Sequence, residues 1–194
     1  MKVLFLDRDG VINRMVHYPH GWDSPQSASD VSLVPDIETI VLWANKRQIP
    51  VVLITNQPGV AKGKMTQKTA DHIHQSIFNK LLAAGARIDK EYICPHHPNA
   101  VVPSLQSVCR CRKPSPGLLE MAAEEMDIDF SHSLFLGDKA TDVEAGTAAG
   151  VKTILYMHSE DELDKTRLAQ KARADYKIHN LKEALSIFEE FFLK

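Results

Sequence analysis

The chain has 194 residues, of which 44% are hydrophobic and 25% are charged, and its formal net charge at pH 7 is −2. This composition is typical of a soluble globular protein with one hydrophobic core, and it excludes a largely disordered chain. The balanced charge offers no broad basic face, so neither nucleic acid nor a membrane is an expected partner. We expect a single domain over residues 1–194.

Short apolar segments rich in β-branched residues alternate with segments of helical periodicity along the chain. Strands are predicted at residues 3–6, 51–54, 88–93, 133–136 and 152–156, with a weaker one at 175–179. Helices are predicted at about residues 35–47, 66–84, 116–126, 141–149, 160–172 and 181–192. Because nearly all strand residues are apolar, the pattern indicates an α/β protein with a doubly wound parallel sheet covered on both faces.

Two proline-containing stretches, residues 15–34 and 94–116, fit neither periodicity and are predicted to be long loops. Compact domains rarely carry structureless loops beyond about 12–15 residues unless those loops bind something or act as lids. We therefore expect a functional site near both stretches.

The chain contains three cysteines, Cys94, Cys109 and Cys111. An odd number does not suit a secreted disulfide framework, and residues 3–6 are too short for a signal peptide, so a cytoplasmic location is expected. Cys94 with His96 and Cys109 with Cys111 form two chelating pairs, which together fit a closed, structural tetrahedral zinc site. His97 is an alternative to His96, and unliganded surface cysteines are the less favoured interpretation.

Polar residues follow three of the predicted strands, where ligands bind in open parallel sheets. Asp7 and Asp9 follow the first strand, Thr55 the second, and Asp138 the fourth. An isolated Asp at a strand end more often forms a turn or a helix cap, but here several acids converge. Carboxylates that meet without a nearby imidazole or thiol favour Mg²⁺ as their counter-ion.

Phosphoryl transfer also requires positive charge around the transferred oxygens. Arg112 and Lys113, just before a predicted helix, are the candidates, with solvated surface charge as the alternative. Asp142 lies one turn into the next helix and is expected behind the metal ligands. The stretch at residues 59–64 has three residues between its glycines where a nucleotide-binding loop requires four, so ATP binding is not expected.

Four motifs occur together: D-x-D-G-V at 7–11, I-T-N at 54–56, R-K-P at 112–114 and G-D-x-x-x-D at 137–142. In order and spacing they resemble the motifs of the haloacid dehalogenase superfamily, over residues 1 to about 156. Within it the chain most resembles the family of D-glycero-D-manno-heptose 1,7-bisphosphate phosphatases, through L-D-R-D-G at 6–10, T-N-Q-P-G-V at 55–60 and the cysteine loop. Histidinol-phosphate phosphatases are near relatives.

The resemblance implies a monomeric, magnesium-dependent phosphatase with a Rossmann-like fold, a minimal cap and a zinc-binding loop at 94–111. The implied substrate is a small phosphorylated sugar, and the implied reaction removes the 7-phosphate of the heptose bisphosphate. Histidinol phosphate or another small monoester is the alternative substrate. A zinc-stabilised binding module that has lost catalysis is the alternative outside the enzymes. The stretch at 15–34 is longer than the usual turn of the family, which leaves the substrate open.

The resemblance also implies roles for individual residues. Asp7 would be the nucleophile that forms an aspartyl-phosphate, and Asp9 the general acid and later the base. Thr55 and Lys113 would hold the transferred phosphate. The remaining implied contacts are Mg²⁺ with Asp7, the Asp9 backbone carbonyl and Asp138; substrate with Asn56, Arg112 and Lys139; and zinc with Cys94, His96, Cys109 and Cys111. Because Arg112 and Lys113 follow the last cysteine, zinc removal is expected to lower activity indirectly.

Overall fold

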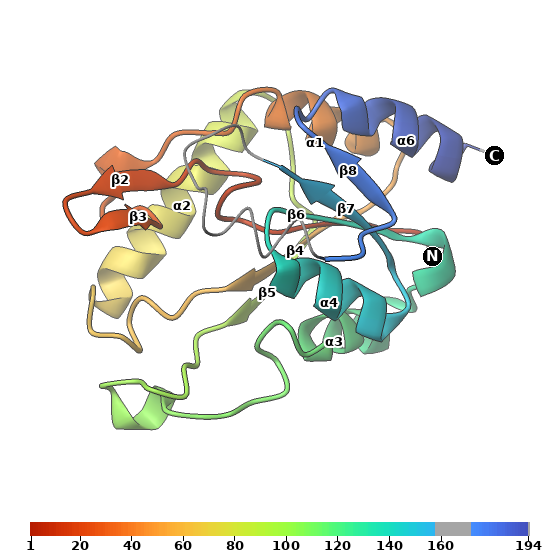
Figure 1. Ribbon diagram of the computed structural model, residues 1–194. Coiled ribbons are helices and arrows are strands. Elements are labelled where there is room, and N and C mark those ends of the chain that lie inside the picture. Colours follow the sequence, from red (N-terminus) through yellow and green to blue (C-terminus); the bar gives the residue numbers. More distant parts are fainter. Residues whose placement is uncertain (158–171, 194) are drawn as a thin grey trace.

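Residues 1–157 and 172–193 are described by the computed structural model, and six of their strands form one sheet (Figure 1). The order across the sheet is β5-β4-β1-β6-β7-β8, and every neighbouring pair is parallel. The strands are β1 (Leu4–Leu6), β4 (Val51–Asn56), β5 (Lys90–Cys94), β6 (Leu134–Gly137), β7 (Lys152–Tyr156) and β8 (Tyr176–Ile178). The predicted parallel sheet is confirmed, with strand ends displaced by up to two residues.

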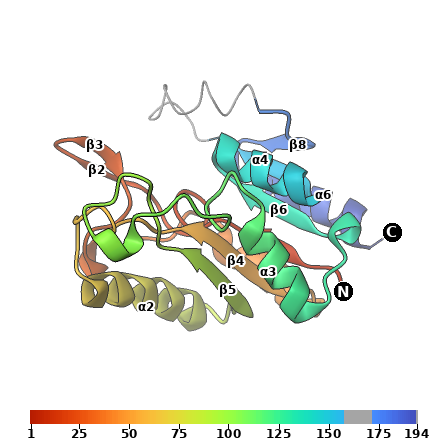
Figure 2. The ribbon, with the colours of Figure 1, turned by 90° about the horizontal axis from the view of Figure 1, so that it is seen from below.

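Helices cover both faces of this sheet (Figures 1 and 2). One face is covered by α1 (Ile37–Lys46), α2 (Gln67–Ala83) and α6 (Glu183–Phe192), and the other by α3 (Gly117–Met126) and α4 (Ala140–Ala149). The helix predicted at 160–172 falls, but for its last residue, outside the described ranges. Among the described residues, no helix combines the length and apolarity that a membrane span needs.

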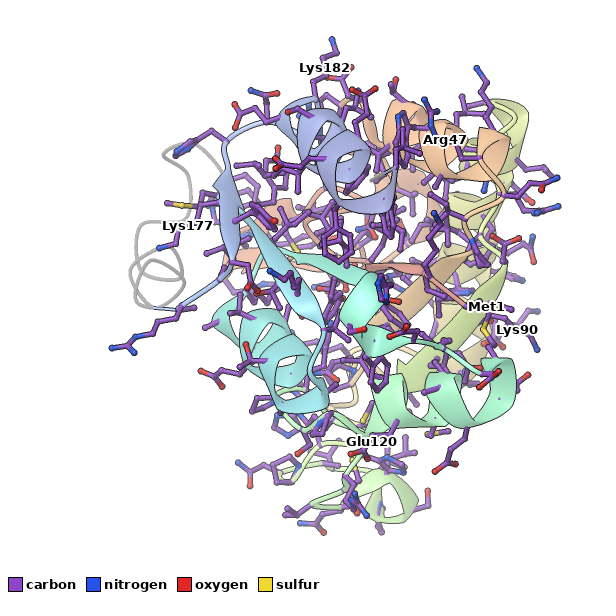
Figure 3. All side chains as sticks on the ribbon, turned by 90° about the vertical axis from the view of Figure 1, so that its right-hand side faces the viewer. Met1, Arg47, Lys90, Glu120, Lys177 and Lys182 are labelled. Carbon is purple, nitrogen blue, oxygen red and sulfur yellow. The ribbon has the colours of Figure 1, made fainter. Side chains whose placement is uncertain are left out.

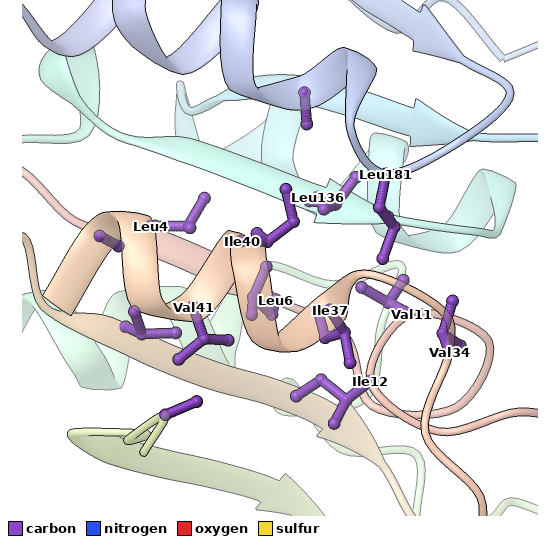
Figure 4. Packing of buried hydrophobic residues seen from close by; sticks show 14 of the residues in the cluster. Leu4, Leu6, Val11, Ile12, Val34, Ile37, Ile40, Val41, Leu136 and Leu181 are labelled. Atoms are coloured by element: carbon purple, nitrogen blue, oxygen red, sulfur yellow. The ribbon is translucent and has the colours of Figure 1, made fainter. Parts of the chain in front are cut away.

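The central strand β1 shows why its sequence is continuously apolar. Leu4 and Leu6 pack into a large cluster with α1 and α6, as Figure 4 shows, whereas Val3 and Phe5 pack into a second cluster with α3. Successive side chains of a strand point to opposite faces, so a strand with helices on both sides is apolar at every position. This burial fixes the position at which the chain leaves the strand.

The last helix is attached to the core by aromatic contacts. Phe188 and Phe192 lie 5.4 and 6.2 Å, between ring centroids, from Trp43 of α1, and both phenylalanines are buried. Charged side chains, in contrast, point away from the molecule at its rim, as the labelled Lys90, Lys177 and Lys182 illustrate (Figure 3). The amphipathic pattern of α6 thus serves packing within the chain.

The prediction of a structureless loop at 15–34 is wrong. Strands β2 (Val16–Tyr18) and β3 (Gly21–Asp23) form an antiparallel hairpin, followed by the 3-10 helix η1 (Ala28–Asp30). Gly21 adopts φ +107 at the turn, and the Tyr18 hydroxyl donates to Asp30 over 2.9 Å. Each strand spans three residues, which is too short for alternating polarity to be visible in the sequence. The other predicted loop contains one short 3-10 helix, η2 (Pro103–Leu105), and a third, η3 (Phe130–His132), precedes β6.

Candidate active site

The acidic residues singled out in the sequence meet at the carboxyl end of the central strands. Asp7 directly follows β1, and its backbone N–H donates to the Leu136 carbonyl of β6 over 3.0 Å. Asp138 directly follows β6, next to β1 in the sheet. The side chains of both acids are 6% exposed or less, so two carboxylates are buried side by side. Such an arrangement requires compensating positive charge.

Two glycines allow the acids to approach each other. A Cβ atom on Gly10, which has φ +94, would lie 2.1 Å from the Asp138 carboxylate, and one on Gly137 would lie 2.2 Å from the Asp142 Cβ. Any side chain at either position would therefore displace an acid. The glycines of the D-x-D-G and G-D motifs are explained by this packing.

Lys113 supplies one of the buried positive charges. Its Nζ lies 2.8 Å from Asp7 Oδ1 and 2.6 Å from Asp142 Oδ1, and it donates to the Ile54 carbonyl over 2.8 Å. The Asn56 carboxamide fixes the backbone of Lys113 through two hydrogen bonds of 3.1 Å. Asn56 was predicted to bind substrate, and that role stays a prediction beside the structural one seen here.

Lys139 supplies the second positive charge and marks the point at which the predicted magnesium ligands converge. Its Nζ lies 2.9 Å from the Asp9 carbonyl, 2.9 Å from Asp138 Oδ1 and 3.6 Å from Asp7 Oδ2. These are the three protein oxygens that the family resemblance assigns to Mg²⁺. Carboxylate oxygens of Asp7, Asp138 and Asp142 also lie within 4.8 Å of one another. The donor set is hard and anionic, and it already surrounds one cation, so it fits a divalent metal.

The Asp9 carboxylate is held separately, by donors on three segments. Arg8 donates to Oδ1 over 2.9 Å, while Ser24 Oγ and Gln57 Nε2 each donate to Oδ2 over 2.8 Å. Gln57 Nε2 also donates to Thr55 Oγ1 over 2.9 Å. The sequence prediction did not include Ser24 or Gln57. Gln57 could have been found because it continues the T-N-Q motif, whereas no pattern marks Ser24.

Burial and neighbouring charges separate the pKa values of these acids. Burial by itself raises the pKa of Asp7 and Asp9, but Lys113 and Lys139 hold that of Asp7, and Arg8 and Lys139 that of Asp9, below the ordinary value. Burial raises the pKa of Asp138 to about 7, with Lys139 opposing and Asp7 adding to the effect. Burial lowers the pKa of Lys113 and Lys139, yet the surrounding acids outweigh it and keep both ammonium groups charged. Asp7 is therefore ionised, as a nucleophile must be.

A cavity of about 330 Å³ lies beside this site, between the hairpin segment and α2. Its lining includes Ser24 and Gln57, three cationic side chains and three acidic ones; the charged residues are Arg8, Lys62, Lys64, Asp23, Asp71 and Glu91. Lys64 forms an ion pair with Asp23, the last residue of β3, which connects the hairpin to the loop after β4. The volume of the cavity suits a small molecule, and Lys62 is a candidate partner for a phosphate group.

The four predicted soft ligands also come together. Contacts among Cys94 Sγ, Cys109 Sγ, Cys111 Sγ and His96 Nδ1 range from 3.1 to 3.8 Å, and all three cysteines are free thiols. A tetrahedron with metal–sulfur bonds of about 2.3 Å has edges of about 3.6–3.8 Å, close to these separations. His97, the alternative ligand, is outside the cluster, and its Nδ1 accepts the Asn99 N–H. The donor set fits a tetrahedral metal such as zinc.

The cysteine cluster contacts the acidic site through its backbone. The Cys94 carbonyl accepts the Gln57 N–H over 2.8 Å, and the His96 carbonyl accepts from Arg112 Nη1 over 3.2 Å. Residues 112 and 113 directly follow Cys111. Movement of the cluster would therefore displace Arg112 and Lys113, the side chains predicted to bind substrate and phosphate.

Known proteins resemble the chain in sequence and in fold. The HAD-hydrolase-like family model matches residues 110–184. A D-glycero-alpha-D-manno-heptose-1,7-bisphosphate 7-phosphatase of Photorhabdus laumondii is 38% identical over 153 residues, covering 78% of this chain and 79% of the relative. The Escherichia coli K12 D-glycero-beta-D-manno-heptose-1,7-bisphosphate 7-phosphatase is 34% identical, with 79% and 77% covered. The crystal structure of the D,D-heptose 1,7-bisphosphate phosphatase from B. bronchiseptica, in complex with magnesium and phosphate, aligns with a TM-score of 0.80 and 29% identity, covering 98% and 99%.

Proposed function

The chain belongs to the heptose-1,7-bisphosphate 7-phosphatase family of haloacid dehalogenase-like hydrolases, and from this premise we propose that it removes the 7-phosphate of D-glycero-D-manno-heptose 1,7-bisphosphate. The observation that carries the proposal is the convergence of Asp7, Asp138 and the Asp9 carbonyl on one ammonium group, that of Lys139, beside the buried Lys113. Four curated relatives with this activity in their names are 34–38% identical to the chain.

In the proposed reaction an Asp7 carboxylate oxygen attacks the phosphorus, and the bond from phosphorus to the sugar oxygen breaks. Asp9 donates a proton to the departing oxygen, which leaves as the sugar hydroxyl. Water then attacks the aspartyl-phosphate, Asp9 takes the proton of that water, and phosphate is released from a regenerated Asp7. Atoms and charge balance over the two steps, and the enzyme returns to its initial state.

The side chains around Asp7 have further roles in the proposed reaction. Lys113 contacts the attacking carboxylate and, with the Thr55 hydroxyl, is assigned to the phosphate oxygens. Asp9 is ionised in the free protein, so the charge of the bound phosphate must raise its proton affinity before it can act as the acid. Arg112 is assigned to the second end of the substrate.

Two metals complete the proposal. Mg²⁺ would be held by Asp7, Asp138 and the Asp9 carbonyl, and it would supply charge neutralisation at the phosphate. Zinc would be held by Cys94, His96, Cys109 and Cys111 and would be structural, since four protein ligands leave no open position. A cytoplasmic, monomeric protein organised as one domain remains the prediction made from the sequence.

Phosphate release from a panel of esters tests the proposal. We expect the purified protein with Mg²⁺ to have a kcat/KM for the heptose 1,7-bisphosphate at least about 100-fold above that for histidinol phosphate. Asp7→Asn and Asp9→Asn should release no phosphate above the background. If the protein preferred histidinol phosphate, that ester would be the substrate in place of the heptose bisphosphate. If it hydrolysed no ester, the alternative of a binding protein would be favoured.

A further inference from the structure

The Asp9 carboxyl group accepts hydrogen bonds from two side chains that lie outside the four sequence motifs. Its Oδ2 accepts one hydrogen bond from Ser24, at the end of the hairpin, and one from Gln57, after β4, each of 2.8 Å. Both donors line the cavity beside the site. Ser24 comes from a segment expected to be a loop without a defined role, so its contact with the predicted general acid needs an explanation.

Ser24 is itself fixed in place from two sides. Its backbone N–H donates to Asp23 Oδ1 over 2.9 Å, and the other oxygen of Asp23 pairs with Lys64. The hairpin end is thereby tied to the loop that follows β4. Gln57 is fixed through its backbone N–H, which donates to the Cys94 carbonyl. Two anchored donors therefore meet at one carboxylate oxygen.

Gln57 also connects the two ends of the expected reaction. Its Nε2 lies 2.8 Å from Asp9 Oδ2 and 2.9 Å from Thr55 Oγ1, so a single amide group joins the proton donor to the hydroxyl assigned to the phosphate. Replacing Gln57 would disturb both partners together. Ser24 contacts Asp9 without contacting Thr55 in any hydrogen bond given for the described residues, and it is the cleaner position for a test.

The chemistry of a hydroxyl group distinguishes Ser24 from the other donors. An ionised carboxylate accepts hydrogen bonds, whereas a protonated carboxyl group also donates one. A serine hydroxyl can rotate to donate to the first form and accept from the second, while the Arg8 guanidinium can only donate. A general acid that becomes a general base passes through both forms in each turnover.

We propose that Ser24 and Gln57 are positioning residues for Asp9, and that each orients its carboxyl group through a hydrogen bond of 2.8 Å to Oδ2. The inference rests on the proposed function, because it assigns Ser24 to the proton-transfer half of that reaction. In this role Ser24 acts through Asp9, to which its hydroxyl donates.

Leaving-group dependence separates a positioning role from a general structural one. Expulsion of an alkoxide requires a proton from Asp9, whereas p-nitrophenolate leaves without one. The parameter kcat/KM reports the steps up to departure of the alcohol and is independent of the later hydrolysis of the aspartyl-phosphate. For Ser24→Ala we expect kcat/KM to fall about 10-fold on the heptose bisphosphate, a primary alkyl ester, and to change less than about 2-fold on p-nitrophenyl phosphate.

Two further variants complete the experiment. Ser24→Thr keeps the hydroxyl and should restore kcat/KM on the alkyl ester to within about 3-fold of the wild type. Ser29→Ala makes the same change as Ser24→Ala in the following 3-10 helix and should leave both esters unaffected. The melting temperature of each variant is recorded, so that a folding defect appears as equal losses on both esters.

The outcomes distinguish this inference from the proposed function. Equal losses of kcat/KM on the two esters, or an increase on the alkyl ester, would overturn the positioning role while leaving the phosphatase assignment intact. If the wild type hydrolysed no primary alkyl phosphate, both assignments would be overturned. Any alkyl phosphate that the wild type hydrolyses can replace the heptose bisphosphate in the comparison.

Discussion

The acidic site and the cysteine cluster are both candidate metal centres, but the chain holds them in different ways. Asp7 and Asp138 extend directly from the two central strands, and their charges are compensated by Lys113 and Lys139. In the cluster, Cys94 ends the edge strand β5, while the other ligands lie in irregular backbone and are partly exposed. The difference teaches that the sheet preorganises the acidic site, whereas the geometry of the loop would be fixed by the proposed zinc ion.

The largest effect is expected at the nucleophile. Asp7→Asn keeps the size of the side chain but removes the attacking anion, so kcat/KM for the heptose bisphosphate should fall on the order of 10⁴-fold or more. Steady-state phosphate release measures this loss. Asp127→Asn, a matching change at an exposed helix end, should retain full activity. Residual activity of Asp7→Asn above about 1% would mean that another group attacks.

Removal of the buried ammonium between Asp7 and Asp142 should have the next largest effect. Lys113→Met leaves two buried carboxylates without their partner, and it should lower the free energy of unfolding by about 3–5 kcal/mol. Urea unfolding measures the change. Lys90→Met removes one member of the Lys90–Glu125 pair, whose side chains are about half exposed, and should cost less than about 1 kcal/mol. Equal costs at the two positions would show that the acidic site is not charge-compensated in the way described.

Loss of a ligand from the cysteine cluster should have a smaller effect than loss of Lys113. It should lower both the stability of the protein and the activity at the acidic site. Cys109→Ser removes one soft ligand, and it should lower the Tm by about 5–10 °C in the presence of zinc. Activity with saturating Mg²⁺ should fall about 10-fold, because residues 112 and 113 lose their anchor. Scanning calorimetry and phosphate release measure the two effects.

His97→Ala is the matched control for the cluster, since His97 neighbours a ligand without joining the cluster. It should shift the Tm by less than about 2 °C. Unchanged stability and turnover in Cys109→Ser, or after selective removal of zinc, would contradict the structural role of the cluster.

The smallest effects are expected for the two arginines that flank Cys111, and the two should differ in their effect on KM. Arg110 pairs with Glu120 at the surface, where its side chain is 88% exposed, so Arg110→Ala should change stability and KM little. Arg112 is anchored to the His96 carbonyl and is assigned to the substrate, so Arg112→Ala should raise KM for the bisphosphate about 10-fold. Initial-rate kinetics measure the KM of both variants. Equal KM values for the two would show that Arg112 does not bind the substrate.

Much of the fold and the acidic site was predictable because both follow from burial in the sheet. A strand covered on both faces is apolar along its buried length, as β1 is and as β4 is up to Ile54, so strands and their polar ends stand out in the sequence. Once the strands are placed, Asp7, Thr55 and Asp138 must lie at one edge. The cysteine cluster was predicted in a different way, from the spacing of its two chelating pairs, and the four predicted ligands lie together in the structure.

What escaped prediction depends on contacts between distant segments. The hairpin of β2 and β3 has three residues in each strand, and its order comes from pairs such as Tyr18 with Asp30. Ser24 reaches Asp9 only because that hairpin folds back over the site. Asn56, expected at the substrate, holds the backbone of Lys113 through its carboxamide, a contact spanning 57 positions. Local sequence patterns carry no record of such long-range hydrogen bonds.

The central claim is that Asp7 becomes covalently phosphorylated during turnover, and chemical trapping tests it most directly. Wild-type protein is mixed with the heptose bisphosphate and Mg²⁺, quenched within milliseconds, and reduced with borohydride, which converts an aspartyl-phosphate to homoserine. Peptide mass spectrometry should then find homoserine at position 7 and nowhere else in the chain. Conversion at a different aspartate, or none at any position during rapid phosphate release, would contradict the account.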